Sequence, residues 1–199
     1  MTATEVPGTR ATRRTPERRA AICDSVFALL AEVGYDRMTM DAVAARAHVS
    51  KATIYRNWPD KPDLVADALS YHFSDAPVLP DTGSLRGDLL AVLTRACQAG
   101  NGLDGEVIVG VMTAAARNPM LAKTMHEAMY EKKHGMHEAL IGRAVRRGEV
   151  PPGTDPHLLH EVLHSMLLTR RLECYQLDDA YARHVVDDVL IPVLSRHVM

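Results

Sequence analysis

Apolar residues recur three or four positions apart along most of this chain of 199 residues, and stretches that alternate apolar with polar residues are nearly absent. A spacing of three and four places apolar side chains on one face of a helix, whereas alternation would place them on one face of a strand. The clearest stripe consists of Ile22, Val26, Leu29, Leu30 and Val33. The pattern therefore predicts an all-α fold.

Capping and helix-breaking residues indicate where the helices start and stop. Thr15 followed by Pro16 is typical of a helix start, because the threonine can cap the first turn and the proline ring suits the first helical position. Gly34 predicts the end of that helix. Further helices are expected after Thr39, after Ser50 as far as about Asn57, and after Asp60 as far as about Phe73.

The stretch 74–84 is rich in proline, aspartate and glycine, which is typical of a linker between domains. It divides the chain into a basic arm at 1–15 that is expected to be disordered, a helical domain at 16–73 and a second helical domain at 84–199. Within the second domain, helices are expected at roughly 84–99, 104–116, 119–147, 156–175 and 179–196.

The composition indicates a globular protein, since 47% of the residues are apolar and can form a sizeable core. The longest nearly continuous apolar run, 107–116, is about half as long as a membrane-spanning helix requires. The N-terminus is polar and rich in arginine, without the apolar stretch of a signal peptide. We therefore expect a cytoplasmic protein with no membrane partner.

Positive charge is concentrated near the N-terminus, although the net charge of the whole chain is −2. Five arginines lie close together there, namely Arg10, Arg13, Arg14, Arg18 and Arg19. Such a run attracts the phosphates of a nucleic acid duplex, but it is equally compatible with a solvated tail.

Residues 39–58 have the pattern of two short helices joined by a tight turn at 48–50. The apolar residues Val43, Ala47, Val49 and Ile54 are expected to pack inward. This leaves five side chains on the exposed side of the second helix, namely Lys51, Ala52, Thr53, Tyr55 and Arg56. The pattern predicts a helix-turn-helix whose second helix enters the major groove of DNA.

The exposed side chains have the chemistry that such a recognition helix requires. Lys51 can donate to guanine acceptors, and the methyl groups of Ala52 and Thr53 can contact that of thymine. The Tyr55 hydroxyl can reach a phosphate, and Lys61 adds positive charge at a helix N-terminus that already favours phosphate. The alternative is a set of packed helices with no DNA role, but inward packing does not require these polar and basic side chains together.

Residues 22–64 resemble the signature of the TetR family of transcriptional regulators. The matching positions are Gly34, Tyr35, Thr39, Val43, Ala44, Ala47, Val49, Ser50, Thr53, Ile54, Tyr55 and Lys61. One departure is His48, where the family commonly has a glycine in the turn. Histidine tolerates a left-handed backbone better than β-branched residues do, so the turn can form at modest cost.

The resemblance implies roles for individual residues. In the family, the residues at the positions of Thr39, Thr53, Tyr55 and Lys61 hold phosphates, and those at Lys51, Ala52 and Tyr55 face bases. The candidate DNA-binding residues are therefore Thr39, Ser50, Lys51, Ala52, Thr53, Tyr55, Arg56 and Lys61.

Two wide apolar stripes lie on the helices expected over 156–175 and 179–196. The resemblance implies that these helices pair with their copies across a two-fold axis and form a dimer interface; the alternative is that they form the core of the monomer. The candidate interface residues are Leu159, Val162, Leu163, Val185, Val186, Val189 and Leu190.

Several of the ten methionines lie in the second domain, where flexible thioethers would suit an adaptable apolar pocket. A methionine stripe is also compatible with an ordinary core, so the expectation of a ligand depends more on the family resemblance. The candidate pocket residues are Met112, Met125, His126, Met129, Tyr130 and Met166.

Histidine and glutamate side chains at positions 157, 160, 161 and 164 share one face of a helix, a spacing that suits zinc or nickel. The alternative is an ordinary polar face, and we assign no metal ligands to His157, His160, Glu161 and His164.

The chain carries no nucleophile motif, phosphate-binding loop or paired carboxylates, so we expect no enzyme activity and no cofactor. The sequence predicts a homodimeric repressor that an unknown apolar small molecule releases from a pseudo-palindromic DNA operator. The alternatives are a metal-responsive regulator and a DNA-binding protein without a ligand.

Overall fold

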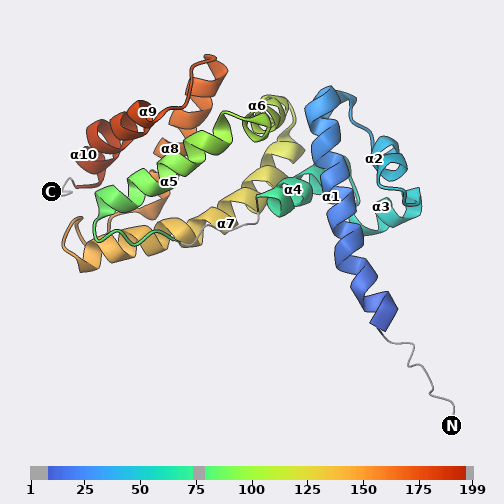
Figure 1. The fold of residues 1–199 in the computed structure, drawn as a ribbon, viewed down its shortest axis with the longest axis horizontal. Helices are drawn as coiled ribbons and strands as arrows, with labels where there is room; N and C mark the ends of the chain where they lie inside the picture. The colour runs from blue at the N-terminus through green and yellow to red at the C-terminus, as the bar shows by residue number, and fades with distance from the viewer. Residues whose placement is uncertain (1–8, 74–78, 196–199) are drawn as a thin grey trace, which may run out of the picture. The chain divides into compact units, whose positions relative to one another are not determined.

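The computed structural model describes the backbone of residues 9–73 and 79–195, and the side chains of 16–73, 79–128 and 134–195. These residues form helices and contain no β-strand (Figure 1), which confirms the predicted all-α fold. The chain divides into two compact units, residues 1–74 (unit 1) and residues 75–199 (unit 2). Each unit is described by itself.

The described residues of unit 1 form four helices, α1 (Thr9–Arg37), α2 (Met40–Arg46), α3 (Lys51–Asn57) and α4 (Lys61–His72). The helix α1 begins at Thr9, within the segment 1–15 that the sequence predicted to be a disordered arm; residues 1–8 lie outside the described residues. Alanine and arginine in this segment are good helix formers, and the fixed φ of Pro16 is compatible with a helix.

Gly34 interrupts α1, with φ of 75° and ψ of 171°. A positive φ is accessible to glycine at little cost, which explains why the apolar stripe ends here and the chain turns toward α2. The core of unit 1 lies where α1 packs against α4 and where α2 and α3 cover them. Its largest fully buried side chains are Ile22, Met38, Ile54, Leu64 and Leu69.

Unit 2 contains long helices that begin at side-chain caps. The carboxamide of Asn118 caps the start of α7, and the carboxylate of Asp155 caps α8. The helices are α5 (Leu85–Gly100), α6 (Leu103–Ala115), α7 (Pro119–Arg146), α8 (Pro156–Leu172), α9 (Asp179–His184), the π-helical turn η1 (Val185–Leu190) and α10 (Ile191–Leu194).

The last helical segment is not a regular α-helix, because the π-helical turn η1 separates α9 from α10. Pro192 follows this turn after one intervening residue, Ile191. Proline has no N–H to donate to the carbonyl four residues earlier, and its ring crowds that carbonyl. Widening the preceding turn accommodates both effects, although the apolar spacing alone predicted one continuous helix over 179–196.

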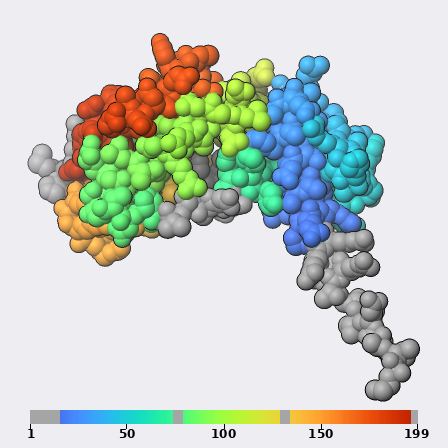
Figure 2. Space-filling model, in the orientation of Figure 1, coloured from blue at the N-terminus to red at the C-terminus, as the bar shows by residue number. Residues whose placement is uncertain are grey.

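The apolar stripes of α8, α9 and η1 face the core of their own subunit. In unit 2, α7 packs against α8, and α5 packs against α9 and η1; Figure 2 shows the side chains of α5 in green directly against those of α9 in red. Five of the seven residues predicted at a dimer interface are buried in this core, namely Leu159, Leu163, Val185, Val186 and Leu190. Within one subunit, these five side chains contact their own neighbours. Val162 and Val189 are only partly buried.

A buried carboxylate joins the start of unit 2 to the end of α7. The side chain of Asp88 is 1% exposed and accepts hydrogen bonds from the Thr82 backbone N–H at 2.6 Å and from its hydroxyl at 2.9 Å. Arg143 and Arg147 approach the other carboxylate oxygen at 3.1 and 3.3 Å. Arg143 also donates to the Pro80 carbonyl. This charge cluster attaches the segment before α5 to the last turn of α7.

Candidate nucleic-acid interface

Hydroxyl side chains fix the starts of α2 and α3. The Thr39 hydroxyl accepts a hydrogen bond from the Ala42 N–H at 3.1 Å, and the Ser50 hydroxyl accepts one from the Thr53 N–H at 3.2 Å. The hydroxyls of Ser50 and Thr53 lie 2.9 Å apart. Each cap satisfies a backbone donor that the first helical turn leaves without an intrahelical partner. Two of the predicted DNA-binding residues, Thr39 and Ser50, therefore also determine where the helices begin.

The turn between α2 and α3 is a left-handed helix ending. His48 has φ of 52°, the Val49 N–H donates to the Ala44 carbonyl at 3.0 Å, and the His48 N–H donates to the Ala45 carbonyl at 3.3 Å. Glycine is the usual residue at the left-handed position of this arrangement. His48 adopts it nonetheless, so the departure from the family pattern leaves the turn intact.

One face of α3 is buried and the other is exposed. Ile54 is fully buried, whereas Lys51, Ala52, Tyr55 and Arg56 are exposed, with Tyr55 at 52%. Thr53 is partly buried beside the Ser50 cap. Figure 2 shows α2 and α3, in cyan, on the outside of unit 1 beside the blue surface of α1. The predicted base-facing residues thus share one exposed helical face, as the major groove requires.

Two cations beside this face are paired with carboxylates of the same chain. The Lys51 Nζ lies 2.6 Å from an oxygen of Asp41 in the first turn of α2. The guanidinium of Arg46 holds both oxygens of Glu32, at 2.6 and 2.7 Å. Sequence reasoning missed these pairs, because their partners lie on different helices and only the packing brings them together.

Lys61 lies at the start of α4, above an aromatic ring. Its Nζ is 4.2 Å from the centre of the Tyr35 ring and donates to the Asp36 carbonyl at 3.4 Å. Burial lowers the pKa of Lys61, and the charge of Asp36 opposes this effect only in part. These contacts hold the ammonium group beside the ending of α1.

Trp58 attaches the end of α3 to the rest of unit 1. It is nearly buried, and its indole N–H donates to Asp67 of α4 at 3.0 Å. The same carboxylate oxygen accepts from Arg19 of α1 at 3.1 Å. The shared carboxylate fixes the angle of the exposed helix relative to α1 and α4. Sequence reasoning used Trp58 only as a helix end and missed this role.

The residues predicted to line an effector pocket do not share one environment. Met125 is buried, Met112 is partly buried and His126 is exposed. The side chains of Met129 and Tyr130 lie outside the described residues. Met166 lines an open pocket of about 290 Å³ whose other lining residues are Ser165, Thr169, Arg170, Glu173 and Tyr181.

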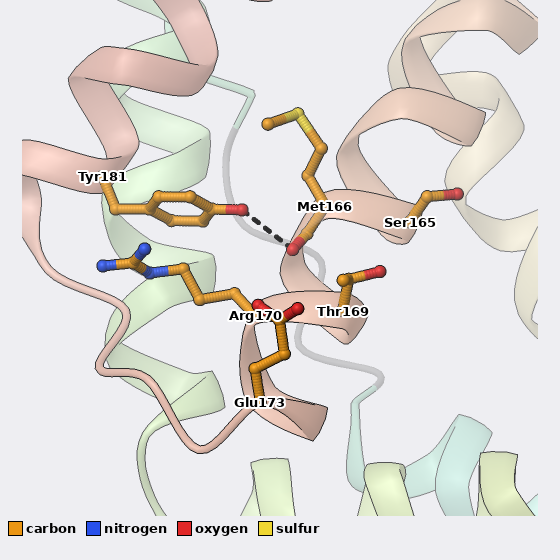
Figure 3. Close-up of a pocket in the computed structure, with 6 residues that line it drawn as sticks. All are labelled: Ser165, Met166, Thr169, Arg170, Glu173 and Tyr181. Carbon is orange, nitrogen blue, oxygen red and sulfur yellow. Dashed lines mark hydrogen bonds between the residues drawn. The ribbon is translucent and has the colours of Figure 1, made fainter.

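The pocket lies between the end of α8 and the start of α9, and two of its polar side chains, Arg170 and Tyr181, are held by nearby groups (Figure 3). The Tyr181 hydroxyl donates to the Met166 carbonyl at 2.9 Å. The guanidinium of Arg170 lies 4.1 Å from the centre of the Tyr181 ring and donates to the Gln176 carbonyl at 2.9 Å. A flat cation–aromatic wall is thus preformed, with Ser165 directed away from it.

The histidines of α8 form a row along one face. Ring centres lie 6.3 Å apart between His157 and His160, and 5.3 Å apart between His160 and His164; His137 of α7 approaches His160 at 5.4 Å. Glu161 turns toward His157, at 3.3 Å. Within the part of the chain that the structure describes, no three histidine, cysteine or acidic side chains are placed to hold a metal ion.

None of the described helices combines the length and apolar content needed to cross a bilayer.

Two family models match the chain, and together they cover both units. Residues 22–68 match the model of bacterial regulatory proteins of the tetR family, and residues 79–189 match that of the Tetracyclin repressor-like C-terminal domain.

Similar proteins and solved structures match this chain over most of its length and most of their own. The chain is 35% identical to a DNA-binding transcriptional repressor TetR of Mycobacteroides abscessus, over 91% of this chain and 96% of that protein. The crystal structure of the TetR family transcription regulator SCO0332 has a TM-score of 0.73 and 28% identity, over 88% of this chain and 97% of its own. Bacillus subtilis FadR, solved with stearoyl-CoA, shares the fold with a TM-score of 0.66 and 16% identity, over 90% and 98% of the two chains. The chain belongs to the TetR family of DNA-binding transcriptional regulators.

Proposed function

We propose that this regulator is a homodimeric repressor that binds a pseudo-palindromic operator in the cytoplasm and is released from it by an apolar small molecule. The observation that carries the proposal is the amphipathic helix α3. Ile54 anchors its inner face in the core, while Lys51, Ala52, Tyr55 and Arg56 are exposed together on its outer face. An exposed helix with a basic residue, a small residue and an aromatic hydroxyl suits the major groove.

The contacts divide into those that read bases and those that position the protein. Lys51 would donate to a guanine, and Ala52 would leave room for the backbone to approach a thymine methyl. Thr39, Tyr55 and Lys61 would hold phosphates on either side, and such contacts bind all sequences alike. Ser50, Thr53 and Arg56 would complete the interface at the start and the end of α3.

The proposed dimer places two copies of α3 in successive major grooves. Val162 of α8 and Val189 of η1 remain partly exposed, and Leu172 at the end of α8 is 54% exposed. Apolar side chains of this kind support an interface with a second subunit. The interface is thus narrower than the sequence predicted, because the five buried residues cannot take part.

The proposed effector site is less well defined. The pocket between α8 and α9 offers the apolar side chain of Met166 and the wall formed by Arg170 and Tyr181. The stearoyl-CoA complex of FadR supports, by analogy of fold alone, a ligand with a long apolar chain. A ligand that binds the DNA-free state more tightly would release the operator by linkage.

Selection of bound fragments from random duplex DNA tests the proposed function directly. We expect the selected fragments to share an inverted repeat whose half-sites lie about one helical turn apart, roughly 34–36 Å, because a two-fold dimer presents two recognition helices. Single half-sites at irregular spacing would contradict the dimer, and absence of any enriched sequence would contradict sequence-specific binding.

Substitutions in the two classes of contact are expected to have different effects. Lys51→Ala should relax the preference for one operator base in each half-site, at a cost of about 1–3 kcal/mol in specific binding. Lys61→Ala should weaken binding to all duplexes alike and lower the salt dependence by about one phosphate contact per subunit. Binding titrations on operator and unrelated duplex at several salt concentrations separate the two. The same loss from both variants on both duplexes would contradict the division.

A further inference from the structure

One basic residue of the proposed interface, Lys51, is already paired with a carboxylate before DNA arrives. Lys51 Nζ lies 2.6 Å from Asp41, and more than half of each side chain is exposed. The hydrogen bond and the charge of Asp41 raise the pKa of Lys51. Arg46 is held at two points by Glu32. The residue that would read a base is therefore also one whose charge is already neutralised.

Binding to arbitrary DNA depends almost entirely on free positive charge, because it is driven by the release of counterions from the phosphates. A lysine paired with an aspartate contributes little to this term, and the carboxylate itself repels a nearby phosphate. A base edge differs from a phosphate in two ways: it carries no net charge, and its acceptor atoms lie at fixed positions in the groove. Lysine has three N–H donors, so Lys51 can donate to N7 and O6 of an uncharged guanine while it stays paired with Asp41, whose carboxylate repels a phosphate but not a base.

We propose that Asp41 is a specificity-determining residue, which suppresses binding to unrelated DNA by keeping phosphates away from Lys51 while leaving Lys51 able to donate to an operator base. The proposal rests on the proposed function, since it concerns the same helix and the same base contact. Asp41 touches no base in this scheme. It acts through the availability of the Lys51 ammonium group.

The variant Asp41→Asn tests this inference on the full-length protein. An asparagine keeps the size and a polar oxygen but removes the charge, so Lys51 is released toward any phosphate. Affinity for unrelated duplex should rise by about three- to tenfold, in line with the loss of one exposed ion pair and the gain of a phosphate contact. Affinity for the operator should rise less than twofold, because the Lys51–Asp41 pair is intact both before and after binding to the operator. The ratio of the two affinities therefore falls, and the salt dependence on unrelated duplex steepens by about 0.9 per subunit.

Two further variants separate this role from a general effect of charge. Asp24→Asn, on an exposed position of α1, changes the net charge by the same amount and should leave the ratio unchanged. In a Lys51→Ala background, Asp41→Asn should no longer change the ratio, because the residue it acts through is gone. Thermal melting of each variant establishes that equal amounts of folded protein are compared.

An unchanged ratio in Asp41→Asn would overturn the inference while leaving the proposed function in place. An equal fall in Asp24→Asn, or a fall that persists in the Lys51→Ala background, would also overturn it. A wild-type protein that does not distinguish its selected operator from unrelated duplex would contradict the proposed function itself, and the inference with it.

Discussion

Replacement of Asp88 by alanine is expected to lower the free energy of unfolding by about 3–5 kcal/mol, because it leaves two partly buried cations without their shared partner. Arg143 and Arg147 are 16% and 26% exposed, and the carboxylate between them is 1% exposed. The Thr82 N–H would lose its acceptor as well. Removing one partner of a buried ion pair destabilises a protein by more than the intact pair stabilises it, since the remaining charge stays buried without a partner.

The same carboxylate predicts a pH dependence. Burial by itself raises the pKa of Asp88, but the hydrogen bonds from Thr82 and the charges of Arg143 and Arg147 outweigh it, so that the pKa is lowered. A group with a lowered pKa in the folded state contributes its stability above its unfolded pKa, about 3.9 for aspartate. That contribution is lost as the pH falls through the folded value. Acid should therefore destabilise the wild type more than Asp88→Asn.

Chemical denaturation at pH 7 and near pH 3 measures both effects. Glu106→Gln, at an exposed position in the first turn of α6, is the control, and should change the free energy of unfolding by less than about 1 kcal/mol. A loss below about 1 kcal/mol for Asp88→Ala, or an equal acid dependence of wild type and Asp88→Asn, would contradict the role assigned to the charge cluster.

The second large effect is expected at Gly105, where α6 meets the end of α5. A Cβ atom there would lie 1.8 Å from the carbonyl oxygen of Gly100 and 2.5 Å from its carbonyl carbon. Backbone atoms cannot move aside as a flexible side chain can, so the two helices would have to separate. Gly105→Ala should lower the free energy of unfolding by about 1–3 kcal/mol, despite the better helix propensity of alanine.

Gly110 on the same helix provides the matched control. It is exposed, and a Cβ atom added there would meet nothing within 4 Å. Gly110→Ala should therefore raise the free energy of unfolding by about 0.5–1 kcal/mol through helix propensity alone. Denaturant titrations of the two variants should give changes of opposite sign. If both variants are stabilised, α5 and α6 can move apart without loss of stability, and the prediction for Gly105→Ala is contradicted.

The sequence by itself determined the features that depend on neighbouring residues. Helix starts are set by side chains that bond to N–H groups two or three positions away, as at Thr39, Ser50 and Asn118. The two faces of α3 are equally local, because Ile54 and the exposed residues around it lie within two turns. The all-α fold and the exposed side of α3 could therefore be predicted before any tertiary contact was known.

Only the tertiary structure decided which partner each face of a helix meets. The stripes of α8, α9 and η1 are equally suited to a second subunit or to α5 and α7, and packing selected the latter for residues such as Leu159 and Val186. The pairing of Lys51 with Asp41, and of Asp88 with Arg143, also joins separate helices. Apolar periodicity predicts that a helix face is buried, but it does not predict which element covers that face. Charges on different helices become neighbours only when the helices pack.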